Sequence, residues 1–218
     1  MSIDVLKRLQ SVWQARGAAG FGRFILSKLY TQRRDLLFEI RIETDGIDRQ
    51  WNGIGKLLCV EKDNAPTAIT PKMLEQIFAG EGADYLPGLN KQDLLFCVLD
   101  DSGNFLHHSF VLFDTRTKHL LGESDSTPLF AHCVTRADTR GMHLFSAVLA
   151  HALSILAKRG HNRAIVNCDP ANAASIAAIQ RAGFSLVRSL DTQILLSFVG
   201  RQAAAARGEQ ARTRFFVI

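Results

Sequence analysis

The spacing of hydrophobic residues predicts strands and helices that alternate along the second half of the chain. Two apolar runs, 94–100 (LLFCVLD) and 105–114 (FLHHSFVLFD), flank an Asp-Ser-Gly-Asn turn, a pattern typical of a β-hairpin. Further strand-like runs lie at 36–43, 56–61, 129–135 and 163–169, and helical spacing lies at 140–160 and 171–182. This order predicts an α/β domain.

The two ends of the chain are expected to extend that domain. Residues 1–34 show helical spacing interrupted by glycines, and 71–80 (PKMLEQIFAG) reads as a helix with proline in its first turn. Residues 184–190 (FSLVRSL) and 192–200 (TQILLSFVG) are predicted to form a closing pair of strands. We expect a single domain over 1–200 and a tail at 201–218 that forms a frayed helix.

Composition and charge are those of a soluble globular protein with an anionic ligand. The chain has 218 residues, 47% hydrophobic, and a formal net charge of +5. Its basic residues are dispersed without interleaved aromatics, which argues against nucleic acid as a partner. No apolar run reaches the ~18 residues of a membrane span and no signal peptide is evident, so a cytoplasmic protein is expected.

The four cysteines, at 59, 97, 133 and 168, all lie in strand-like settings. None belongs to a Cys-x-x-Cys motif, which argues against zinc and against a redox motif. We expect buried free thiols and no metal site.

The turn at Arg140-Gly141 leads into an apolar helix, and the free amides of residues 141–144 would point out of that helix. Amides and helix dipole favour a phosphate or pyrophosphate there, with Arg136, Arg140 and His143 adding charge or donors. The alternative is an ordinary strand-to-helix turn with incidental arginines.

A second helix begins where the next strand ends, near Asn172. This residue reads either as a helix cap or as an amide group that pairs with an amide-bearing ligand. A phosphate cradle after one strand and an asparagine after the next suit a long, phosphate-ended molecule that lies between two splayed strands.

At these residues the sequence resembles the GNAT superfamily of N-acetyltransferases. Asn172, Ser175, Gly183 and Phe184 match the family's second segment, and Arg140-Gly141 matches part of the acetyl-coenzyme A signature. The order of elements fits over 94–199. The resemblance implies a mixed, mostly antiparallel sheet that is splayed at the cofactor site and flanked by helices, with extra N-terminal helices at 1–34.

The resemblance also implies acetyl-CoA as acyl donor. It assigns donor binding to ten residues in two segments, with main-chain N–H groups near Cys133 and Val134 polarising the thioester carbonyl. They are Cys133, Val134, Arg140, Gly141, Met142, His143, Leu144, Phe145, Asn172 and Ser175.

Three positions depart from the family pattern. His143 and Phe145 stand where small residues are usual, and Ile179 replaces a tyrosine that protonates the leaving thiolate in many members. Either water or another donor supplies that proton, or the protein does not turn over.

Glu123 and His132 are the candidate general bases that would take a proton from the incoming amine. The alternatives are a solvated carboxylate for Glu123 and a satisfied core histidine for His132. Asp125 is a weaker option, and alternation allows only one of His107 and His108 to line the cleft. Cys133 as an acyl carrier stays open beside a buried thiol.

The resemblance implies transfer to a primary amine of a small molecule, and the first strand and its preceding helices suggest an amino sugar of bacterial surface-polysaccharide synthesis. A catalytically silent acyl-CoA-binding module and a membrane-surface or scaffold protein remain alternatives, and a homodimer is left open.

Overall fold

The computed structural model describes residues 30–43, 51–61, 91–195, 199–206 and 209–217. The predicted helix at 71–80 and most of the N-terminal helical segment lie outside the described residues. The chain divides into two compact units, 36–188 and 1–35 together with 189–218. Strands β1 (Tyr30–Arg41) and β7 (Ser185–Leu195) contribute residues to both. The fold is α/β.

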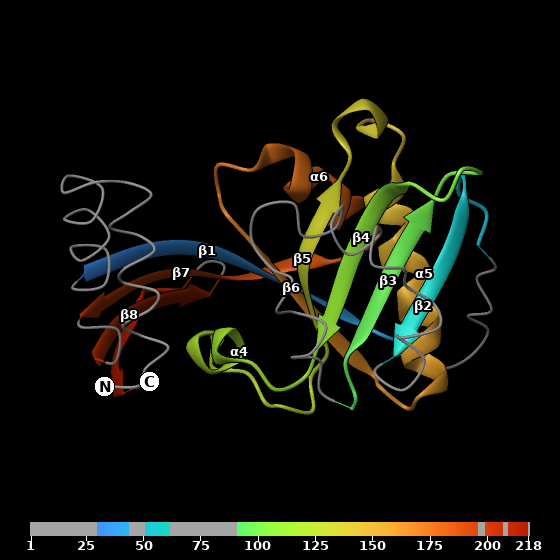
Figure 1. Ribbon diagram of the computed structural model, residues 1–218. Coiled ribbons are helices and arrows are strands. Elements are labelled where there is room, and N and C mark those ends of the chain that lie inside the picture. Colours follow the sequence, from blue (N-terminus) through green and yellow to red (C-terminus); the bar gives the residue numbers. More distant parts are fainter. Residues whose placement is uncertain (1–29, 44–50, 62–90, 196–198, 207–208, 218) are drawn as a thin grey trace, which may run out of the picture. The chain divides into compact units, whose positions relative to one another are not determined.

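The larger unit contains a mixed, mostly antiparallel sheet in the order β2-β3-β4-β5-β6-β1 (Figure 1). Its strands are β2 (Lys56–Glu61), β3 (Leu94–Leu99), β4 (Phe105–Leu112), β5 (Leu129–Thr135), β6 (Arg163–Cys168) and the end of β1. The predicted hairpin is confirmed as β3 and β4. The Asp100 carboxylate accepts the N–H groups of Ser102 and Asn104 in its turn. β3 is buried along its whole length, as expected for a central strand.

The sheet opens between β5 and β6. These parallel neighbours pair only at Leu129↔Ile165 and Phe130↔Val166, while β5 continues to Thr135 alongside β4. The last five residues of β5 are therefore bonded on one side only within the described sheet, as the predicted splay requires.

Helices α4 (Arg116–Leu121), α5 (Leu144–Lys158) and α6 (Ala173–Arg181) complete the larger unit. α5 packs on β4 and β5 through a buried apolar face that includes Val148, Leu149 and Leu156. This confirms the predicted helix after Arg140 and fixes its first turn beside the end of β5. α6 packs against α5 and β6.

In the smaller unit, the start of β1 lies beside β7, followed by β8 (Val199–Ala206) and β9 (Arg212–Val217). Three predictions are wrong here. Residues 30–34 are strand and not helix, β7 runs unbroken through 185–195 where two strands were expected, and the tail forms β8 and β9 instead of a frayed helix.

Sheet pairing explains these differences, because it overrides weak local preference. Asp191 and Thr192, at the expected boundary between the two strands, have their side chains hydrogen-bonded within the sheet. Asp191 accepts from Gln32, and Thr192 accepts from Gln202 at 2.8 Å.

No helix among the described residues has both the length and the apolar character to cross a bilayer.

Candidate functional site

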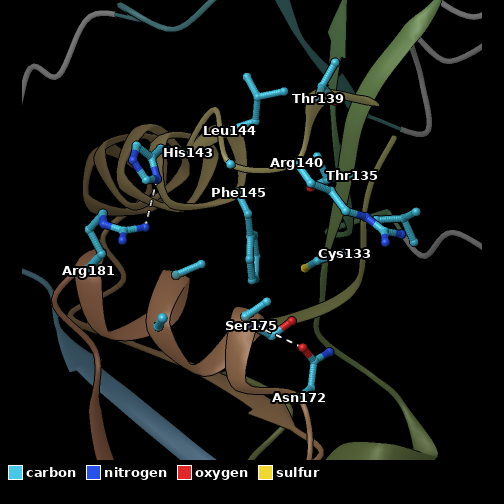
Figure 2. A pocket seen from close by; sticks show the side chains of 15 residues that line it. Cys133, Thr135, Thr139, Arg140, His143, Leu144, Phe145, Asn172, Ser175 and Arg181 are labelled. Atoms are coloured by element: carbon cyan, nitrogen blue, oxygen red, sulfur yellow. Dashed lines mark hydrogen bonds between the residues drawn. The ribbon is translucent and has the colours of Figure 1, made fainter. Parts of the chain in front are cut away.

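A cavity of about 590 Å³ lies where the sheet opens, between the end of β5, the start of α5 and one face of α6 (Figure 2). Nine of the ten residues predicted to bind the acyl donor line it. They are Cys133, Val134, Arg140, Gly141, His143, Leu144, Phe145, Asn172 and Ser175. Met142, the tenth, is 54% exposed and does not line the cavity.

Six further lining residues were not predicted. Ala174, Ala177, Ala178 and Arg181 form one face of α6 at helical spacing, and this stripe of alanines ending in arginine is the sequence signal that would have revealed them. Thr135 follows from strand alternation with Cys133, whereas Thr139, at the short 3-10 turn before α5, has no such signal.

The N-terminus of α5 opens into this cavity without a protein cap. Its N-cap residue, His143, makes no side-chain cap hydrogen bond, and the first turn contains no acidic residue. By contrast, Thr115 caps α4 and Asn172 caps α6. The first-turn amides of α5 therefore lack an intrahelical acceptor, and the helix dipole favours an anion beside them.

The backbone before α5 is shaped to expose these amides. Gly141 has φ +87° and His143 has φ +58°, both in the left-handed region. This conformation is strained for His143, because a residue with a Cβ rarely adopts it. A Cβ added to Gly141 would meet nothing within 4 Å, so the space beside it is open. A phosphate group can approach the main chain closely at this turn.

The two arginines predicted near the phosphate differ in their partners. Arg136 is bound to Asp138 (Nε–Oδ1 2.7 Å) and to Asp100 (Nη1–Oδ2 3.4 Å), and it does not line the cavity. Its charge is thus compensated by two carboxylates. Arg140 lines the cavity, and within the described residues no carboxylate forms an ion pair with it. Arg140 is therefore the arginine available to an anionic ligand.

Asn172 is both a cap and a lining residue. Its Oδ1 accepts the N–H of Ser175 at 3.1 Å, which stabilises the first turn of α6. Figure 2 shows the Nδ2 group of Asn172 directed away from that bond, so this donor is available at the cavity wall. The two interpretations of Asn172 are therefore compatible.

A β-bulge in β5 determines which residues face the cavity. Ser109 of β4 lies opposite two residues of β5, His132 and Cys133, and the register shifts between His108 and Phe110. His132 takes the strained φ of +48°. Beyond the bulge, Cys133 and Thr135 line the cavity.

Beneath the cavity, His107 links both strands through a buried polar chain. Its Nδ1 hydrogen-bonds Thr135 Oγ1 and its Nε2 hydrogen-bonds Ser109 Oγ, each at 2.7 Å, and its ring stacks on Phe145 at 5.6 Å between centroids. Burial lowers the pKa of His107 to about 3, so the imidazole is neutral at pH 7. Burial also raises the pKa of Cys133 to about 12, which keeps it a thiol and argues against an acyl carrier.

His132 lies on the other face of the sheet. Its ring meets Phe110 edge-on at 6.1 Å, and Phe110 meets His108, whereas His107 and Ser109 face the cavity. His132 is exposed, and it does not line the cavity. It therefore stands next to Cys133 in sequence and opposite to it in direction.

Glu123 does not line the cavity but is buried in ion pairs with two arginines. Its side chain is 6% exposed, and its carboxylate binds Arg163 (Nη1–Oε2 2.8 Å) and Arg188. Arg163 also binds Glu39 at 2.7 Å. These ion pairs connect the segment before β5, which contains Glu123, to strands β6, β1 and β7. The structure thus contradicts the interpretation of Glu123 as a solvated carboxylate, while its role as a base stays a prediction.

Two further positions lie outside the cavity. Ile179 is 1% exposed and belongs to the apolar core, and its hydrocarbon side chain has no proton to donate. Asp125, the weaker base candidate, is exposed beside His119 and Asp114, and one ligand atom from each of the three lies within 4.8 Å of the others.

Comparison with known proteins shows similarity of fold. No protein-family model and no curated protein matches the sequence. A GCN5-related N-acetyltransferase from Sphaerobacter thermophilus is 13% identical, with a TM-score of 0.50 over 83% of this chain and 57% of that one. A Drosophila protein is 12% identical, with a TM-score of 0.52 over 82% and 58%.

The chain therefore spans less than two thirds of the length of these two solved structures. The opening between parallel β5 and β6, the uncapped helix that begins there and the alignment to the Sphaerobacter enzyme agree with one another. This chain has the fold of the GCN5-related (GNAT) N-acetyltransferases.

Proposed function

We propose that the protein is an N-acyltransferase that uses acetyl-CoA to acetylate a primary amine of a small molecule, with an amino sugar as the favoured acceptor class. The observation that carries this proposal is the uncapped N-terminus of α5, which opens into a cavity at the splayed sheet with Arg140 in its wall. The fold similarity supports the same reaction class.

The residues present suit the phosphates and amides of acetyl-CoA. The amides of Leu144 and its neighbours, the open turn at Gly141 and the guanidinium of Arg140 would hold the pyrophosphate. The free edge of β5 around Val134 and the Nδ2 group of Asn172 would bind the amides of the pantetheine arm. Among the residues that the structure describes, no acidic side chain lines the cavity to repel these groups.

Acetyl-CoA supplies an activated thioester, from which the acetyl group passes to nitrogen as a C–N bond forms and the C–S bond breaks. Main-chain N–H groups at Cys133 and Val134 would stabilise the charge that develops on the carbonyl oxygen. His132 is exposed on the face of β5 opposite to the cavity, so it would take the amine proton from an acceptor that reaches the thioester from that face, through the opening between β5 and β6.

A catalytically silent acyl-CoA-binding module is the second candidate. The observation in its favour is that the cavity lining, within the described part of the chain, includes no tyrosine and no carboxylic acid, while Ile179 is buried in the core. This module would bind acetyl-CoA without releasing a thiol in the presence of amines.

Calorimetry with acetyl-CoA tests the proposal on wild type, Arg140→Ala and Arg41→Ala. Arg41 is an exposed arginine that does not line the cavity, so it controls for the loss of one charge. We expect wild-type and Arg41→Ala binding to agree and Arg140→Ala to bind about tenfold or more weakly, as for loss of one charged hydrogen bond. Absence of wild-type binding would overturn the assignment.

Thiol release then separates enzyme from silent module. Wild-type protein is incubated with acetyl-CoA and a panel of amino sugars, polyamines and amino acids, and free thiol is measured. Release that depends on one amine class identifies an enzyme and its acceptor. Binding without release for any amine favours the silent module.

A further inference from the structure

Arg181 lines the same cavity from α6 and has no role in the assignment so far. Its Nη1 lies 3.0 Å from Nδ1 of His143. Because a guanidinium can only donate, His143 must accept at Nδ1 and carry its own proton at Nε2. The hydrogen bond therefore fixes both the position of Arg181 and the tautomer of His143.

The partner of Arg181 stands at the start of α5. His143 is the N-cap residue of α5, and its ring is turned toward Arg181 instead of capping the helix. Figure 2 shows Arg181 and Arg140 on opposite sides of the cavity, with the first turn of α5 between them. Positive potential thus reaches the cavity from three directions.

Neither cavity arginine is neutralised within the part of the chain that the structure describes. The ion pairs there involve Arg33, Arg34, Arg136, Arg159, Arg163 and Arg188, and none involves Arg140 or Arg181. A guanidinium has five N–H donors, so the bond to His143 leaves Arg181 able to bind a phosphate in bidentate fashion.

We propose that Arg181, held by His143, binds a second phosphate group of the acyl donor, separate from the pyrophosphate at Arg140 and α5. This inference rests on the proposed function. Coenzyme A carries such a group as the 3′-phosphate of its ribose, whereas a phosphopantetheine arm on a carrier protein does not. Arg181 then selects nucleotide-bearing acyl-CoA as the donor class.

The spacing along α6 supports two distinct contact points. Ser175 and Arg181 are six residues apart, which corresponds to about 9 Å along a helix. The amide-binding end of the cavity, at Asn172, is therefore well separated from Arg181. An extended ligand that contacts both must also pass the first turn of α5, which lies between them.

The test compares coenzyme A with 3′-dephospho-coenzyme A by calorimetry on wild type, Arg181→Ala, Arg181→Lys and Arg140→Ala. For wild type we expect coenzyme A to bind about tenfold more tightly than the dephospho form, the size of one charged hydrogen bond. Arg181→Ala should abolish that ratio and leave dephospho-coenzyme A affinity unchanged. Arg181→Lys should retain part of the ratio, and Arg140→Ala should weaken both ligands equally.

The outcomes separate the two proposals. An unchanged ratio in Arg181→Ala, or no wild-type preference, overturns the role of Arg181 while acetyl-CoA binding by wild type upholds the proposed function. If neither coenzyme binds to wild type, the proposed function fails and this inference fails with it. Circular dichroism of each variant checks that α6 remains folded.

Discussion

The imidazole of His107 and the hydroxyl of Thr135 hydrogen-bond across the β4–β5 pair, with 2.7 Å between Nδ1 and Oγ1. This contact joins a buried residue to one that lines the cavity, at the strand segment that has lost its partner on the β6 side. It therefore stabilises the open part of β5 from below.

Replacing Thr135 by valine removes this bond without a large change in volume. We expect a loss of about 1–3 kcal/mol in the free energy of unfolding, because a buried imidazole nitrogen is left unsatisfied. Thr135→Ser retains the hydroxyl and should lose much less. Urea unfolding measures both, and equal stability of the valine variant and wild type would show that the bond contributes little.

Acid should destabilise the folded chain through its buried histidines. Burial lowers the pKa of His107 to about 3, and burial with the nearby charge of His132 lowers that of His108 to about 4. In the unfolded chain these histidines bind protons near pH 6.5, whereas in the folded chain they stay neutral to a lower pH. The free energy of unfolding is therefore highest above about pH 6.5 and decreases below it. Each histidine contributes about 1.4 kcal/mol per pH unit.

Urea unfolding between about pH 5 and about pH 7 gives this slope, and His107→Gln should make it shallower by about one proton. The decrease due to His108 should level off near pH 4, whereas that due to His107 continues toward pH 3. A slope that His107→Gln does not change would contradict the assignment of a neutral His107.

Glu123→Gln should reduce stability and should not act as loss of a catalytic base. The substitution leaves Arg163 and Arg188 without a carboxylate partner, and since both arginines are about one-third exposed we expect about 1–3 kcal/mol, less than for a fully buried pair. Urea unfolding and acetyl-CoA binding are measured together. If Glu123→Gln is as stable as wild type but no longer releases thiol from acetyl-CoA, Glu123 acts as the base.

Two glycines at opposite ends of α5 provide a matched pair. Gly141 precedes the helix with φ +87° and Gly160 follows it with φ +82°, and an added Cβ meets nothing within 4 Å at either. Alanine at each should cost about 1 kcal/mol of stability from the left-handed backbone. Only Gly141→Ala should also weaken acetyl-CoA binding, and equal affinity of the two variants would argue against close approach of the ligand there.

Asn172→Ala and Asn172→Ser separate capping from ligand binding. Alanine loses the cap of α6 and should cost about 1 kcal/mol, whereas serine keeps a capping oxygen and most of the stability. Both lose the Nδ2 donor, so both should bind acetyl-CoA more weakly. If serine binds as tightly as asparagine, Asn172 acts only as a cap.

Local sequence signals predicted the segments that contain the cavity. The apolar spacing after Arg140 and the strand-like run 129–135 each identified an element whose ends meet at the opening of the sheet. The cavity residues Gly141 and Asn172 follow from the starts of the two helices, whereas Cys133 was assigned through the family resemblance. These signals are local, because caps, turns and periodicity are properties of neighbouring residues.

Long-range pairing determined what the sequence did not reveal. Glu123 reads as a loop carboxylate until the chain brings Arg163 and Arg188 to it from 40 and 65 residues away. Arg181 ends the alanine stripe of α6, but its contact with His143, 38 positions earlier, depends on the packing of α6 against α5. The alanine-rich tail is a strand because β8 and β9 pair with each other.

The bulge in β5 accommodates one extra residue without changing the side-chain directions on either side of it. Its extra residue is absorbed at His132, so Phe130 before it and Thr135 after it keep the faces that their β4 partners require. Deletion of His132 would restore plain alternation and leave Cys133 and Thr135 directed at the cavity. A residue can thus be gained or lost at this point of β5 while Cys133 and Thr135 still line the cavity.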